Sequence, residues 1–166
     1  MVFTGSRLQL DVVALGDESF MFDWENNPEN WAVSEGEGPY TLSEIRQFIT
    51  TCDDLIEHHQ IRFVVRQIQN QIPIGAFDFF NFDAKSNKVG LGILIADKSD
   101  RKKGYASECL TEHLPQMMQY FNLSEVYALV FKDNIASIRL FEKCGFTVQR
   151  TTIYKNKSTL VYTFKR

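Results

Sequence analysis

The segment 101–106, RKKGYA, places three cations directly before Gly104, where a stretch with helical spacing begins. Cations are unfavourable at that end of a helix, because its unpaired backbone N–H groups already carry partial positive charge. A bound phosphate or diphosphate would offset the repulsion, and a glycine lets such an anion approach the backbone closely. The order of residue types therefore predicts an anion site, with a solvated basic turn as the alternative.

Two common phosphate-binding patterns do not match this chain. The P-loop pattern G-x-x-x-x-G-K-S/T is absent. Gly90 and Gly92 lie inside an apolar stretch, and no third glycine opens a helix, so the dinucleotide fingerprint is excluded. Glycines inside a strand predict a bulge or a place where a ligand approaches the backbone.

Composition limits the class of protein further. The chain has 166 residues, of which 44% are hydrophobic, and we expect one folded domain over 1–166. A net charge of −3 argues against a nucleic-acid partner. Without a long apolar run or an apolar signal core, we expect no membrane span. Three cysteines without paired spacing predict reduced thiols in the cytoplasm and no metal site.

The charges are unevenly distributed along the chain. Residues 17–57 hold eleven acids and a single base, and the rest of the chain is basic. A solvated helix surface would explain this stretch. The functional alternative is an acidic wall that attracts a cationic substrate.

Hydrophobic spacing predicts a mixed α/β fold: one mostly antiparallel sheet of about seven strands with helices on both faces. Strands are expected at 6–13, 61–68, 72–83, 89–97, 124–131, 146–154 and 158–165. Helices are expected at 17–25, 41–57, 103–121 and 134–144. Pro115 should bend or divide the third helix, and Gly145 should end the fourth.

Two segments resemble one family. RKKGYA resembles the diphosphate-binding signature Q/R-x-x-G-x-G/A of the GCN5-related N-acetyltransferases (GNAT). About thirty residues later, NIASIRLFEKCGF (134–146) resembles the second signature of that family. The two signatures occur in the same order as in the family, and each falls at the start of a helix expected from the spacing. The N-terminal phrases WENNPENWAVSEG and PYT resemble the branch of spermidine and ribosomal-protein N-acetyltransferases.

The resemblance implies a splayed central strand pair and the transfer of an acetyl group from acetyl-CoA to an amine. It implies that Leu94, Ile95 and Ala96 pair with the pantetheine arm, and that an N–H near Ile95 binds the thioester oxygen. Asn134 and Phe141 would border the CoA. The diphosphate would be held by the loop Arg101, Lys102, Lys103, Gly104, Tyr105 and Ala106. Asn134 is equally suited to be a helix N-cap.

Two proton transfers accompany this reaction. A carboxylate must help to deprotonate the amine, and we assign Glu35, in the acidic loop, as the candidate base. The other candidates are Glu37, Asp78 and Asp97. Phe141 stands where many family members have a tyrosine acid, so we assign Ser137 as the candidate for protonating or binding the departing thiolate, with Tyr105 and Tyr127 as alternatives.

The expected substrate is a small-molecule amine, and the acidic stretch favours a polyamine or another small cation. Two alternatives remain open. A non-catalytic CoA-binding sensor would explain the missing tyrosine, and a protein N-terminus could be the acceptor amine. No metal is expected, and a homo-oligomer is compatible with the sequence.

Overall fold

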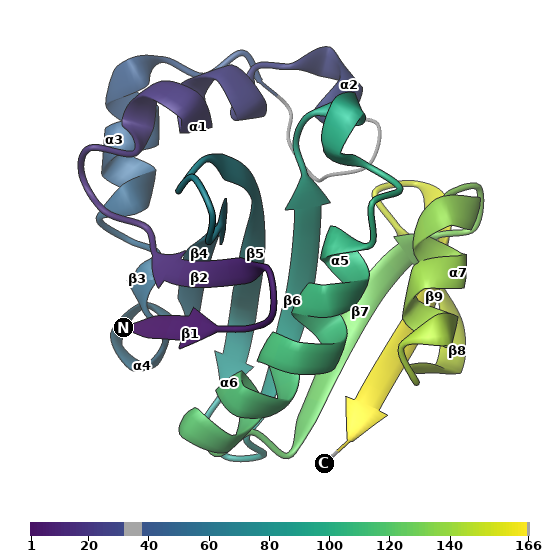
Figure 1. The fold of residues 1–166 in the computed structure, drawn as a ribbon. Coiled ribbons are helices and arrows are strands. Elements are labelled where there is room, and N and C mark those ends of the chain that lie inside the picture. Colours follow the sequence, from purple (N-terminus) through teal and green to yellow (C-terminus); the bar gives the residue numbers. More distant parts are fainter. Residues whose placement is uncertain (32–37, 166) are drawn as a thin grey trace.

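The structure is a computed structural model that describes residues 1–31 and 38–165. A single open sheet of nine strands, in the order β1-β2-β4-β5-β6-β7-β9-β8 with β3 beside β4, runs through these residues (Figure 1). The strands are β1 (Val2–Thr4), β2 (Leu8–Val12), β3 (Asp53–Asp54), β4 (Gln60–Gln67), β5 (Pro73–Asp83), β6 (Lys88–Ile95), β7 (Glu125–Phe131), β8 (Thr147–Tyr154) and β9 (Lys157–Lys165).

The predicted mixed, mostly antiparallel sheet is confirmed, because β6 and β7 form the one parallel pair among the described strands. The expected count of about seven strands is too low. The two additional strands are β1 and β3, which have three and two residues and are too short for alternation to reveal.

The described helices are α1 (Glu18–Glu25), α2 (Pro28–Trp31), α3 (Leu42–Ile49), α4 (Leu55–His58), α5 (Tyr105–Glu108), α6 (Leu114–Tyr120) and α7 (Ile135–Lys143). The helix expected over 41–57 ends at Ile49, and β3 and α4 replace its second half. Pro115 divides the long helix as predicted: a π-helical turn (Cys109–His113) joins α5 to α6. None of these helices combines the length and apolar character that crossing a membrane requires.

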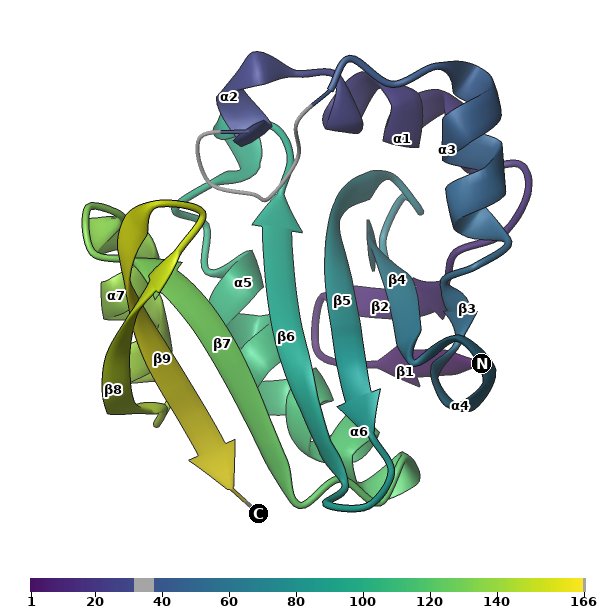
Figure 2. The same cartoon turned by 180° about the vertical axis from the view of Figure 1, so that it is seen from behind.

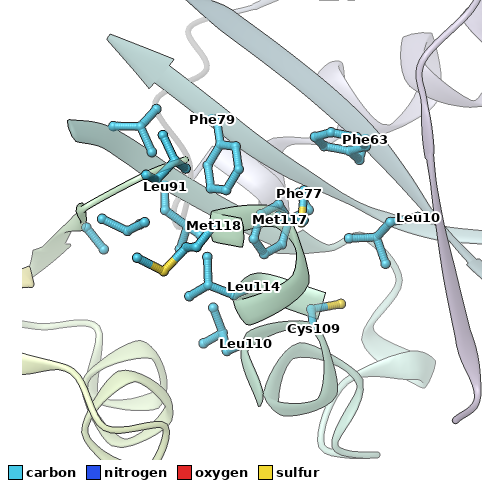
Figure 3. Close-up of a cluster of buried hydrophobic side chains, with 14 of the residues drawn as sticks. Leu10, Phe63, Phe77, Phe79, Leu91, Cys109, Leu110, Leu114, Met117 and Met118 are labelled. Atoms are coloured by element: carbon cyan, nitrogen blue, oxygen red, sulfur yellow. The ribbon is translucent and has the colours of Figure 1, made fainter. Parts of the chain in front are cut away.

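Helices cover both faces of the sheet, as expected. On one face, α5, α6 and α7 enclose the main core, which includes Phe77, Phe79, Leu114 and Met117 (Figure 3). On the other face, α1 and α3 pack Met21, Ile45 and Ile49 against Val64 of β4. The sheet therefore separates two sides of the molecule.

The strands β6 and β7 lie side by side at one end and diverge toward the other, as Figure 2 shows. Beyond the divergence, Ile93 of β6 and Leu129 of β7 line one cavity, so a gap separates the two strands there. Their pairing is limited to Lys88–Gly90 of β6 with Glu125–Tyr127 of β7. The register between β5 and β6 shifts between the pairs Phe80–Gly90 and Asp83–Lys88, next to Gly90, where the sequence predicted a bulge or a ligand. A Cβ on Gly90 would lie 2.3 Å from the Phe80 ring, so the protein's own aromatic side chain fills that place. A Cβ on Gly92 would meet nothing closer than Asp78 at 3.7 Å.

Candidate active site

The edge of β6 that faces the gap offers main-chain groups to a ligand. The Ala96 N–H donates to the Ile74 carbonyl (3.0 Å), so Ala96 is turned toward β5. Because main-chain groups alternate along an antiparallel strand, Leu94 also faces β5, and Ile93 and Ile95 face the gap. The prediction for Leu94 and Ala96 therefore needs correction: of the three residues, Ile95 alone points its main chain into the gap, and Ile93 was missed.

The basic loop lies next to this edge. Gly104 has a φ of +87° and precedes α5, so its conformation favours glycine, and Tyr105 and Ala106 form the first turn of the helix. Lys102 is exposed, and the Lys103 ammonium pairs with Asp100 (Nζ–Oδ1 2.9 Å).

Arg101 does not add its charge to the mouth of the loop, contrary to expectation. Its Nε donates to the Ile95 carbonyl (2.9 Å), and its Nη2 donates to Asn30 Oδ1 (2.8 Å) and the Ala96 carbonyl (3.1 Å). The side chain is therefore turned back toward the end of β6 and toward α2.

Arg7 brings a cation to the loop that sequence reasoning missed. Its Nε donates to the buried Glu108 carboxylate (2.7 Å), and its Nη1 donates to the Lys103 carbonyl (3.2 Å). A Cβ on Gly104 would lie 3.4 Å from Arg7 Nη2, which places this guanidinium directly beside the glycine. No local signal could reveal this contact, because it joins residues about 100 positions apart.

A cavity of about 570 Å³ opens on the α1–α3 side of the sheet and reaches β6. We call it the acidic cavity. Its lining includes three carboxylates, Glu25, Glu44 and Asp78, and one arginine, Arg62. The aromatic side chains that line it are Trp24, Tyr40, Phe48, Phe79, Phe80, Phe131, Phe141 and Tyr154. The combination of acids and aromatic faces suits an organic cation.

Arg62 joins two of these carboxylates. It binds Asp78 in a bidentate manner (Nε–Oδ1 2.7 Å, Nη2–Oδ2 3.0 Å) and Glu25 through Nη1 (2.5 Å). Burial alone would lower the pKa of Arg62, but the charges and hydrogen bonds of Asp78 and Glu25 outweigh it and raise this pKa. Arg62 is therefore a permanent cation that offsets part of the negative charge.

The second signature forms the opposite end of the acidic cavity. Asn134 Oδ1 accepts the Ser137 N–H (3.1 Å), so Asn134 is the N-cap of α7, and both residues line the cavity. Phe141 is 4% exposed and lies against Phe146 (ring centroids 4.9 Å). Because Phe141 is a phenylalanine, the position that holds a tyrosine acid in many family members offers no hydroxyl here. Tyr154, at the end of β8, lines the same region and was not singled out from the sequence.

Of the candidate bases, Glu35 and Glu37 lie outside the described residues, and their role stays a prediction. Asp97 accepts the Ser99 N–H (2.6 Å), and its hydrogen bonds to Ser99 lower the pKa of Asp97. It caps a turn and lies outside the cavity lining. Asp78 is the one sequence-derived candidate that the described structure places in the acidic cavity. In residues 1–31 and 38–165, no three His, Cys, Asp or Glu side chains gather in a metal-binding group.

Comparison with known proteins assigns the chain to a family. The profile of the family described as an acetyltransferase (GNAT) domain matches residues 7–147. Spermidine N(1)-acetyltransferase of Vibrio cholerae is 26% identical over 142 residues, covering 85% of this chain and 79% of that protein. A probable spermine N(1)-acetyltransferase of Bacillus subtilis subsp. natto is 24% identical over 87 residues, covering 52% of this chain. That alignment spans 57% of the Bacillus protein, so it covers little more than half of that relative's length.

Solved structures have the same fold. The V. cholerae spermidine N-acetyltransferase in complex with CoA and spermine has a TM-score of 0.86 at 20% identity, covering 97% of this chain and 96% of that one. The ribosomal-protein-S5-alanine acetyltransferase of Vibrio fischeri has a TM-score of 0.85 at 15% identity, covering 99% and 96%. The family profile covers most of the chain, including the basic loop and α7, and the chain belongs to the GNAT acetyltransferase family.

Proposed function

We propose that this protein transfers the acetyl group of acetyl-CoA to a primary amine of a small polycation such as a polyamine. One observation carries the proposal: the free edge of β6 meets the basic loop 101–106 on one side and, on the other, a cavity lined by carboxylates and aromatic side chains. A thioester placed in the gap would meet an amine that enters from the acidic cavity. The names of the spermidine- and spermine-acetylating relatives support this substrate class.

The cofactor would be held mainly by main-chain groups. The Arg101 N–H already donates to the Lys98 carbonyl (3.2 Å), so the N–H groups that suit the diphosphate are those of 102–106. Lys102 and Arg7 add charge beside Gly104. The pantetheine arm would pair with the free edge at Ile93. The Ile95 carbonyl already accepts from Arg101, whereas its N–H faces the gap and suits the thioester oxygen, on which negative charge develops.

The acceptor amine would enter as a cation. A primary ammonium has a pKa of about 10.4, so it must lose a proton before it attacks. Glu25, Glu44 and Asp78 attract the cation, and the aromatic faces around them favour it further. We assign Asp78, acting through a water molecule, and Glu35 as the two candidates for removing the proton.

We expect Ser137→Ala to lower kcat by about tenfold while the KM for acetyl-CoA changes by less than about twofold. Ser137 lines the cavity on the first turn of α7, beside the position where Phe141 has no hydroxyl. Steady-state kinetics with both substrates varied would measure this. An unchanged kcat would remove Ser137 from the mechanism.

Cys52 is the cavity-lining thiol, and we expect it to take no covalent part. It is 1% exposed, and burial raises its pKa to about 12. Since the thiol is neutral well below that pH, its nucleophilic form is scarce at pH 7–8. Cys52→Ala should keep kcat within about threefold, and mass spectrometry should find no acetylated protein after incubation with acetyl-CoA alone. An acetyl group on Cys52 would contradict direct transfer.

The proposed function is tested by adding acetyl-CoA and following both melting temperature and thiol release with three acceptors. These are a polyamine, a monoamine and a peptide with a free N-terminus. A raised melting temperature with turnover of the polyamine supports the proposal. Stabilisation without turnover of any amine would favour the CoA sensor, which the buried Phe141 suggests. Preference for the peptide would favour an acceptor like that of the ribosomal-protein acetyltransferases.

We further propose that the protein acts in the cytoplasm. Its three cysteines are free and buried, as suits a reducing compartment. The absence of a metal requirement and a homo-oligomeric state remain predictions, to be checked by activity after chelation and by sedimentation.

A further inference from the structure

Arg101 is the first cation of the diphosphate signature, yet its side chain joins two other parts of the molecule. Its guanidinium donates to the Ile95 and Ala96 carbonyls at the end of β6 and to Asn30 Oδ1 on α2. A planar fork of donors can bind three acceptors at once, which a lysine ammonium on a flexible stem cannot match in geometry.

Asn30 continues this connection into the acidic cavity. It is 2% exposed, and its Nδ2 donates to the Trp24 carbonyl (3.0 Å). Trp24 and the neighbouring Glu25 line the cavity. We call residues 18–31, which form α1 and α2, the helical wall.

Two further contacts hold the helical wall together and in place. The Trp31 indole N–H donates to the Glu25 carbonyl (2.6 Å), and the ammonium of Lys98, just after β6, forms an ion pair with Glu29. Two contacts thus join α2 to the residues at the end of β6. The Arg101 side chain in the first is half-buried, whereas both charges of the second, the Lys98–Glu29 pair, are exposed. Exposed pairs contribute little, so of these two contacts to the end of β6 the Arg101–Asn30 hydrogen bond is the stronger. The α1 part of the wall is held separately to β4, by the Glu25–Arg62 pair and by Met21 against Val64.

We propose that Arg101 is a positioning residue that holds the helical wall of the acidic cavity against the end of β6. It thereby sets the distance between the bound amine and the thioester, rather than binding the diphosphate. This role rests on the proposed function in so far as the acidic cavity receives the amine. A misplacement of the wall would reduce productive encounters between the two substrates without weakening the cofactor.

The test compares Arg101→Lys, which keeps the charge, with Lys102→Met in the same loop. For Arg101→Lys we expect kcat/KM for the amine to fall about tenfold, while the dissociation constant of acetyl-CoA changes less than about threefold. Tryptophan emission should shift to the red, because the chain's two tryptophans, Trp24 and Trp31, both lie on the helical wall. Lys102→Met should weaken acetyl-CoA binding and leave the emission unchanged.

Asn30→Ala removes the Arg101–Asn30 hydrogen bond by changing its acceptor. This second variant decides the test if Arg101→Lys folds poorly. It should reproduce the loss in amine kcat/KM and the red shift, and the double variant should be no worse than either single one. Wild-type emission and kinetics in Asn30→Ala would overturn the proposal, as would an Arg101→Lys variant that loses only acetyl-CoA affinity. Should no amine be acetylated, the proposed function fails, whereas emission and acetyl-CoA affinity still decide the role of Arg101.

Discussion

Replacing Gly104 by glutamate is expected to weaken acetyl-CoA binding by more than about 100-fold. The φ of +87° disfavours any side chain, and a Cβ at this position would lie 3.4 Å from Arg7 Nη2. The new carboxylate would also occupy the helix start, where the diphosphate needs the N–H groups, and would neutralise Arg7 or Lys102. Isothermal titration calorimetry with acetyl-CoA would measure the loss.

Gly104→Ala separates the effect of backbone strain at this positive φ from the effect of the negative charge that glutamate adds. A left-handed alanine costs about 1–2 kcal/mol, and part of this strain would appear as lower stability rather than lower affinity. We therefore expect an affinity loss below about tenfold for alanine, well short of the loss for glutamate. Equal affinities for acetyl-CoA in wild type and Gly104→Glu would place the diphosphate elsewhere and remove the basis of the proposed function.

The parts of the site that depend on neighbouring residues in the chain were predictable from the sequence. Gly104 before a helix, Asn134 as an N-cap and the division of a helix at Pro115 all follow from local backbone chemistry. The strands of the sheet were predictable for the same reason, except β1 and β3, whose few residues give no alternation.

The parts that depend on distant pairing were not predictable. Which residues of β6 face the gap is set by the hydrogen-bond register with β5, so apolar spacing could not distinguish Ile93 from Leu94. Arg7 reaches the loop only because β2 packs beside α5. The sequence placed Arg101 in the diphosphate loop and could not show where its side chain turns, because its acceptor on α2 lies 71 residues away.

Replacing Arg62 by methionine is expected to lower the free energy of unfolding by about 3 kcal/mol. The Arg62 side chain is 14% exposed and is the shared partner of Asp78 and Glu25, whose carboxylates are 24% and 20% exposed. Without the guanidinium, two partly buried negative charges would face each other beside the acidic cavity. Urea unfolding followed by tryptophan fluorescence would measure the change.

The matched control is Arg46→Met, which breaks the Arg46–Glu18 pair on the surface of α3 (Nε–Oε1 3.3 Å). Arg46 is 55% exposed, so its removal should cost less than about 1 kcal/mol. If uncompensated charge causes the loss at Arg62, adding Asp78→Asn and Glu25→Gln to Arg62→Met should restore part of the stability, because both carboxylates then become neutral amides. A triple variant no more stable than Arg62→Met would instead attribute the loss to packing of the Arg62 stem and of its guanidinium over the Phe48 ring (4.8 Å).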